Sequence, residues 1–218
     1  MEREKVIREL KKFADLKYRD FSKRLVFTKY EMIGVRLPKL KELAKNFDFF
    51  EIDKNSTFEE IMLYGFILAR EKNISNQRII EYFEYVDNWS VCDSFTCALK
   101  KNNGEDFYNF LLKIIDDYSE GLSGVFLVRF AIVSLMRNFL PQKSEQVLKK
   151  LNKINSSEYY INMAIAWVIC EAIIKDYLVA LDWLPKFDKF IRNKAISKCC
   201  DSFRISEEKK EYLKSLRV

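Results

Sequence analysis

Apolar residues recur every three to four positions along nearly the whole chain, which is the period of one face of an α-helix. In residues 2–16, for example, Val6, Leu10 and Phe13 form one apolar stripe on a charged segment. Capping and helix-breaking residues interrupt the stripes at short intervals, which predicts roughly a dozen helices with short connections. Start signals lie at Pro38, 55–57, Ser75, 87–88, Gly104, 121–124, Pro141, 156–157 and Ser206.

Short connections favour antiparallel neighbours, and successive helix pairs recur at roughly the 35–45-residue spacing of helical repeat proteins. The pattern favours an all-α solenoid of HEAT-like antiparallel helix pairs, which would supply a concave surface, and an irregular helical bundle remains open. With only 5 Gly and 3 Pro, the chain has too few turn residues for an all-β fold. No linker or change in composition divides it, so residues 1–218 are expected to form one HEAT-like repeat domain.

The composition excludes several kinds of catalytic and nucleotide-binding site. The chain has no His, which excludes Ser-His-Asp and Cys-His triads, and it has no Gly-rich phosphate loop. No cofactor, nucleotide or metal is expected. The net charge of +6 permits an anionic partner without requiring one. The odd number of cysteines, 5, without a C-x-x-C pair, indicates reduced structural thiols. No apolar run reaches the ~18 residues of a membrane span. We therefore expect a cytoplasmic monomer that does not bind membranes.

Trp89 and Asp93 are the first candidate pair. On a helix they are i,i+4 neighbours on a polar stripe with Thr96 and Lys100, opposite the core-facing Val91 and Phe95. A Trp beside a carboxylate on that stripe suits a binding site. A half-buried Trp with a solvated Asp is the structural alternative.

Charged or aromatic residues in three later segments are further candidates. Arg129 lies in a helix that is apolar nearly all round, so it needs either an internal anion or an external phosphate. Trp167 lies in a similar helix, where core packing is the simpler role. A basic amphipathic helix near the C-terminus carries Arg192, Lys194 and Lys198 and is followed by Arg204. This stripe is either a solvated face or a phosphate-contacting one.

Six segments together resemble the DNA alkylation repair family, the AlkD-like HEAT-like repeat glycosylases. The resemblance covers almost the whole chain, and the order of the motifs is more specific than any one of them. They are IGVRLPKLKELAK (33–45), DNWSVCD (87–93), RFAIV (129–133), AIAW (164–167), NKA (193–195) and SFR (202–204).

The resemblance implies an all-α solenoid of HEAT-like helix pairs with a concave basic face that binds duplex DNA, including alkylated or distorted DNA. It implies Trp89, Asp93 and Trp167 as the catalytic residues and Arg129 as the phosphate-binding arginine. Further DNA contacts are expected from Lys100, Arg137, Arg192, Lys194, Lys198 and Arg204. A cationic N3- or N7-alkylpurine leaves without a protonated acid, which agrees with the absence of His. Residues 18–31 are short compared with the excising members, and they resemble a compact subgroup that lacks an N-terminal DNA-gripping element.

Three hypotheses follow. The leading one is a DNA-binding protein of this family, with N-glycosylase activity on cationic alkylpurines. The second is a catalytically silent binder of distorted or branched DNA, which the short segment favours. The third is a protein-binding helical solenoid, which the absence of a contiguous basic face would favour.

Overall fold

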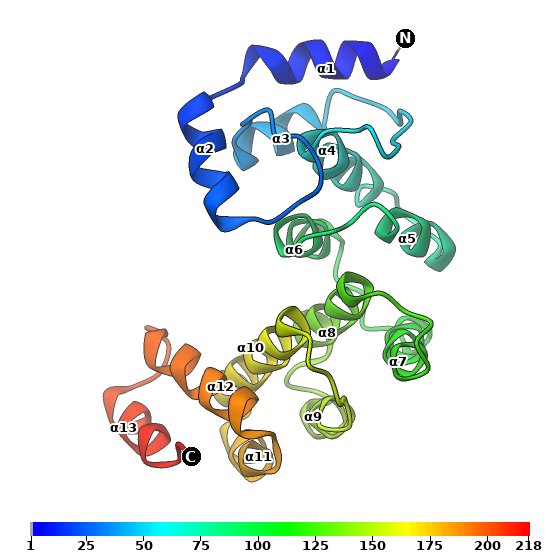
Figure 1. Ribbon diagram of the computed structural model, residues 1–218. Helices are drawn as coiled ribbons and strands as arrows, with labels where there is room; N and C mark the ends of the chain where they lie inside the picture. Colours follow the sequence, from blue (N-terminus) through cyan, green and yellow to red (C-terminus); the bar gives the residue numbers. More distant parts are fainter. Residues whose placement is uncertain (1) are drawn as a thin grey trace. The chain divides into compact units, whose positions relative to one another are not determined.

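The computed structural model describes residues 2–218, and these residues contain helices but no β-strand. The chain divides into two compact units, Met1–Lys100 and Lys101–Val218. The all-helical prediction is confirmed, and the packing within the units is that of an α-solenoid (Figure 1). That one domain spans residues 1–218 stays a prediction.

Residues 2–100 of the N-terminal unit contain six helices, which Figure 1 shows in blue to green. They are α1 (Glu2–Lys12), α2 (Leu16–Leu25), α3 (Leu37–Leu43), α4 (Phe58–Leu68), α5 (Asn76–Phe83) and α6 (Trp89–Ala98). Helix α4 is at the centre and packs against α1, α3 and α6. Thr57 begins α4 with a capping box to Glu60, and Ser75 caps α5, as their positions predict.

A buried carboxylate fixes the loop before α3. Glu59 is 2% exposed and accepts backbone N–H bonds from Ile33 at 2.8 Å and from Gly34 at 2.7 Å. Gly34 has φ +97°, and a Cβ there would collide with the backbone of Asp15, so only glycine fits. The loop is thereby held against the start of α4, and the N–H of Asp15, the cap of α2, donates to the carbonyl of Gly34 at 3.0 Å.

The C-terminal unit contains the remaining helices. They are α7 (Glu105–Ser119), α8 (Val125–Phe139), α9 (Ser144–Leu151), α10 (Tyr159–Lys175), α11 (Tyr177–Trp183), the 3-10 helix η1 (Leu184–Lys186), α12 (Lys189–Asp201) and α13 (Glu207–Ser215). Helices α8, α10 and α12 pack in a row, and α9 and α11 pack together alongside it (Figure 1). This row with a second layer of partner helices is the arrangement expected of stacked helix pairs.

Two predicted helix starts differ from the structure. Pro141 lies in a turn, and α9 begins three residues later at Ser144, because the carbonyl of Pro141 accepts the hydroxyl of Ser144 at 2.9 Å. Helix α10 begins at Tyr159 rather than after 156–157. Ser156 instead accepts the N–H of Glu158 at 3.1 Å, a local turn that competes with helix formation.

Candidate functional site

The start of α6 is set by Asn88. Its side chain accepts the N–H of Val91 at 3.0 Å, which places Trp89 at the first helical position. Val91 and Phe95 are 2% and 1% exposed, so the predicted core face of the helix is confirmed. Trp89 and Asp93, one turn apart, are both half-buried and not part of that core.

The predicted polar stripe is wrong at one position. Thr96 is fully buried, and its hydroxyl donates to the carbonyl of Cys92 at 2.8 Å. A hydroxyl that donates to the carbonyl four residues earlier lets a threonine be buried within its own helix. Lys100 is exposed and follows the end of the helix. The stripe therefore consists of Trp89 and Asp93.

Helix α2 holds Trp89. The indole N–H donates to the carbonyl of Leu25 in a long hydrogen bond of 3.4 Å. Just before α6, Asp87 accepts the hydroxyl of Thr28 at 2.9 Å and the N–H of Lys29 at 2.7 Å. The segment after α2 is thus fastened directly beside the candidate pair.

A small apolar cavity of about 140 Å³ lies against Trp89. Its walls come from α2, the start of α3, α4 and α6, and include Phe21, Leu25, Phe58 and Met62. Helix α2 has no buried residue of its own, and Phe21 and Leu25 are about half exposed. One side of the indole therefore faces a space that protein atoms do not fill.

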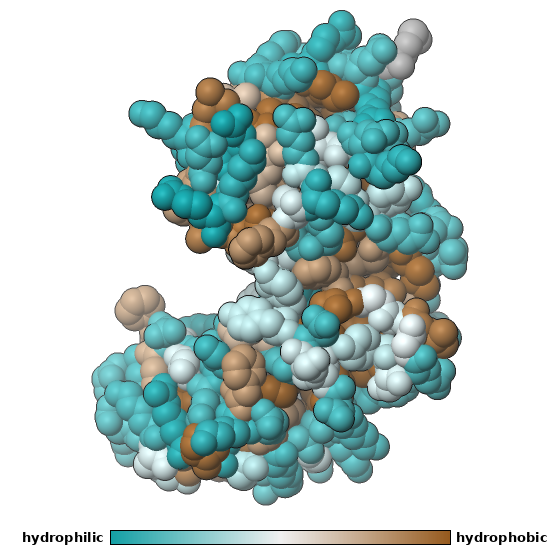
Figure 2. All heavy atoms as spheres, viewed as in Figure 1, coloured by the Kyte–Doolittle hydropathy of each residue, from teal (hydrophilic) through white to brown (hydrophobic). Residues whose placement is uncertain are grey.

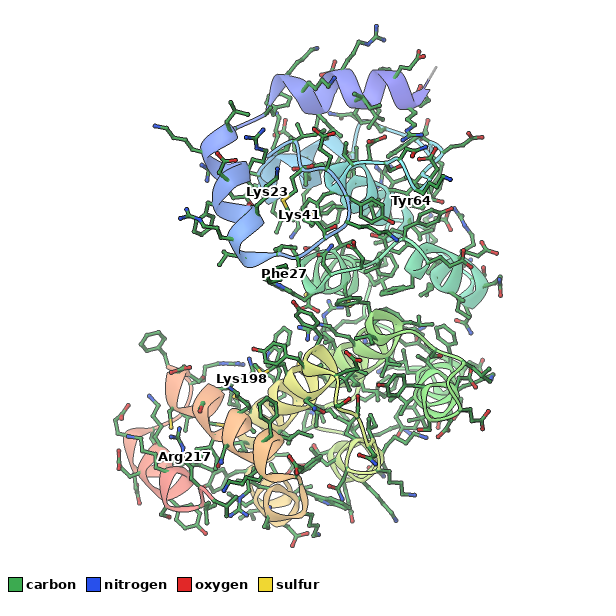
Figure 3. The ribbon with its side chains drawn as sticks, viewed as in Figure 1. Lys23, Phe27, Lys41, Tyr64, Lys198 and Arg217 are labelled. Atoms are coloured by element: carbon green, nitrogen blue, oxygen red, sulfur yellow. The ribbon has the colours of Figure 1, made fainter. Side chains whose placement is uncertain are left out.

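In the C-terminal unit, Trp167 does not have the core role that its apolar surroundings favour. It is half-buried and lines a hollow of about 270 Å³ between α10 and α12. Lys198 and Arg204 line the same hollow, and Figure 3 shows Lys198 on α12. The structure therefore brings three of the predicted site residues together.

Sequence reasoning missed Glu171, which also lines this hollow. It is 9% exposed and forms a two-point ion pair with Arg204, whose Nη1 donates to Oε2 at 3.1 Å. The pair raises the pKa of Arg204 above its usual value. The signal was available: Glu171 follows Trp167 at i,i+4, as Asp93 follows Trp89.

Arg129 is buried, as its sequence context predicts, with 7% exposure. Its Nη1 donates to the carbonyl of Tyr160, 2.8 Å away near the start of α10. The guanidinium therefore fastens α8 to α10. A phosphate contact by Arg129 stays a prediction.

The other predicted DNA-binding residues are at least partly accessible. Arg137 is half-buried near the end of α8, and Arg192 is half-buried on α12 with its Nε enclosed. Lys194 and Lys198 lie one turn apart on α12. The C-terminal residues cover part of this helix, because Arg217 donates to Ser197 at 3.2 Å (Figure 3).

The three predicted catalytic residues and the predicted phosphate-binding arginine are divided between the two units. Trp89 and Asp93 belong to the first unit, and Trp167 and Arg129 to the second. That they converge on one surface stays a prediction. Within residues 2–218, no group of acidic residues and cysteines is arranged to hold a metal ion. No helix in the same range is both long enough and apolar enough to cross a bilayer.

Comparison with known proteins identifies a family for this chain. The family model described as DNA alkylation repair enzyme matches residues 6–199, which include Trp89 on α6 and Trp167 on α10. Neither the curated proteins nor the solved structures gave a match.

Proposed function

The chain belongs to the DNA alkylation repair enzyme family, and from this membership we propose that it binds duplex DNA and excises cationic N3- and N7-alkylpurines. In this proposal Trp89, Asp93 and Trp167 are the catalytic residues. The observation that carries it is the half-buried Trp89–Asp93 pair on one face of α6, with its indole fastened to α2.

The proposed reaction needs no acid on the leaving group. A base alkylated at N3 or N7 is already positively charged, so it leaves with the electron pair of the glycosidic bond and becomes neutral. Water then adds to the sugar carbon and releases a proton to solvent. The carboxylate of Asp93 would stabilise the positive charge that develops on the sugar and position the water. The indole faces of Trp89 and Trp167 would attract the cationic base or sugar.

DNA binding would come from basic side chains on exposed parts of both units. Lys100, Arg137, Arg192, Lys194, Lys198 and Arg204 are the proposed contacts. In this proposal Arg129 contacts a phosphate, because it belongs to the family motif at residues 129–133. Its guanidinium also fastens α8 to α10. Phosphate contacts of this kind give affinity without sequence preference.

The test is to incubate the purified protein with duplexes carrying N7-methylguanine or N3-methyladenine and to measure the released base. Matched duplexes with uracil or hypoxanthine are the controls, because those neutral bases need protonation. Binding to an unmodified duplex is measured in parallel as a function of salt. The logarithm of the binding constant should fall with the logarithm of salt concentration by about 0.9 for each phosphate neutralised.

The outcomes separate the hypotheses. Release of the alkylated bases, without release of uracil or hypoxanthine, supports the glycosylase hypothesis. Salt-dependent binding without release leaves a silent binder of distorted or branched DNA. A salt slope near zero, or no binding at low salt, rejects DNA as the partner and favours a protein-binding solenoid.

A further inference from the structure

Phe203 is the most exposed large apolar side chain among residues 2–218, with an exposed fraction of 103%. It lies in the turn between α12 and α13. Single exposed apolar residues are common and mean little by themselves. The surroundings of this one give it significance, because it neighbours the hollow that Trp167 lines.

The turn itself is fixed although the ring is free of protein contacts. Ile205 is 6% exposed and anchors one end in the core. Arg204 binds Glu171 on α10, and its backbone N–H donates to the hydroxyl of Ser202 at 3.2 Å. The residues on both sides of Phe203 are therefore held, and the ring projects from a rigid support.

The helix that leads into the turn carries a net positive charge, which favours an anionic partner, although the hollow itself balances Lys198 and Arg204 against Glu171 and Asp201. Helix α12 carries four basic residues, Lys189, Arg192, Lys194 and Lys198, and one acidic residue, Asp201. Lys198 lines the hollow together with Trp167. Figure 2 shows that the visible face of the C-terminal unit is mainly hydrophilic, with apolar side chains scattered over it.

We propose that Phe203 inserts into DNA and stacks on an unstacked base at a distorted site, while Lys198 contacts a neighbouring phosphate. This rests on the proposed DNA-binding function and adds a residue that selects distorted over regular duplex. An apolar side chain that enters between base steps must unstack them, and this costs least where stacking is already weak. Every base offers an aromatic face, so such a contact tolerates any sequence.

The test compares the whole chain with two alanine variants on two duplexes. One duplex is fully paired, and the other carries a tetrahydrofuran abasic analogue beside 2-aminopurine. Phe203→Ala should weaken binding to the abasic duplex roughly tenfold and leave binding to the paired duplex unchanged. Leu178→Ala, on α11 with 79% exposure, is the matched control and should change neither affinity.

A second readout reports insertion directly. The fluorescence of 2-aminopurine changes when its stacking changes, so the wild type should alter it on binding and Phe203→Ala should not. Both variants should melt at the wild-type temperature, because neither side chain is buried. If Phe203→Ala keeps the wild-type preference for abasic DNA and the wild-type fluorescence change, the insertion proposal is wrong while DNA binding stands. If the wild type binds neither duplex, the proposed function itself fails, and insertion with it.

Discussion

The indole N–H of Trp89 donates to the backbone carbonyl of Leu25, so the first residue of α6 is tied to the last residue of α2. The orientation of a proposed catalytic side chain therefore depends on a helix that has no buried residue of its own. Residues 18–31, which the family resemblance marks as short, contain most of that helix. A substitution that destabilises α2 should therefore also change the orientation of the Trp89 indole.

Replacing Asp93 with Asn should abolish most base release from N7-methylguanine DNA. The amide keeps the shape of the carboxylate but cannot stabilise a developing positive charge, a loss of about 2.7–4 kcal/mol, or on the order of 10²–10³ in rate. Single-turnover base release is the measurement. Affinity for unmodified duplex should stay at the wild-type value, because a carboxylate does not attract phosphates. Full activity in Asp93→Asn would show that the carboxylate assignment is wrong.

Replacing Arg129 with Ala should lower both the thermal stability and the DNA affinity. The variant loses the bond to the carbonyl of Tyr160 that fastens α8 to α10, and a hydrogen bond from a charged group contributes about 1.5–3 kcal/mol. The salt slope separates the two effects. If Arg129 contacts a phosphate, the slope should fall by about 0.9. An unchanged slope with a lower melting temperature would assign Arg129 a purely structural role.

Gly65→Ala should destabilise the N-terminal unit by about 1–3 kcal/mol, measured by denaturant unfolding. A Cβ at this position would collide with the hydroxyl of Tyr82, which is buried and donates to the carbonyl of Ile61 at 3.1 Å. Gly124→Ala is the matched control, because a Cβ there meets no atom within 4 Å. Equal effects in the two variants would contradict the packing argument.

The cap of α2 should weaken in acid. Asp15 accepts the N–H of Tyr18 at 2.9 Å and a guanidinium N–H of Arg36 at 2.9 Å, and these bonds hold its pKa below the ordinary value of 3.8. A lowered folded-state pKa means that the stabilisation is complete above 3.8 and is lost as the pH falls through the folded-state value.

Amide exchange of α2 measures this effect. Protection of the α2 amides, relative to those of α4, should fall as the pH is lowered below 3.8. Asp15→Asn is the control, since Asn also caps helices but does not titrate. Its α2 protection should stay constant over the same pH interval. A wild-type profile as flat as that of the variant would count against the cap.

The elements that follow local rules could be predicted from the sequence. Thr57, Ser75 and Ser206 cap the helices expected of them, because an N-cap acts on the N–H groups two or three residues away. The i,i+4 relation of Trp89 and Asp93 is equally local, and it is present.

Features that depend on tertiary contacts could not be predicted from the sequence. The bond from Arg129 to Tyr160 joins positions 31 apart, and Arg204 meets Glu171 across 33 positions. The apolar pattern around Trp167 gave no sign that α12 leaves a hollow in front of it, because periodicity reports one helix and not its neighbour. Thr96 was predicted on the polar stripe but is buried, because its hydroxyl donates to the carbonyl of Cys92 within the same helix.

The pairing of Arg204 with Glu171 changes what the positive net charge means for an approaching polyanion. A lone ammonium group such as that of Lys198 acts at a distance as a monopole. A guanidinium held against a carboxylate acts as a dipole, whose field decays faster and depends on direction. Arg204 would then contribute little to the long-range capture of DNA and more to its alignment in the last few ångströms. The formal charge of +6 already counts Arg204 and Glu171 as cancelling each other, so it contains no trace of this source of orientation.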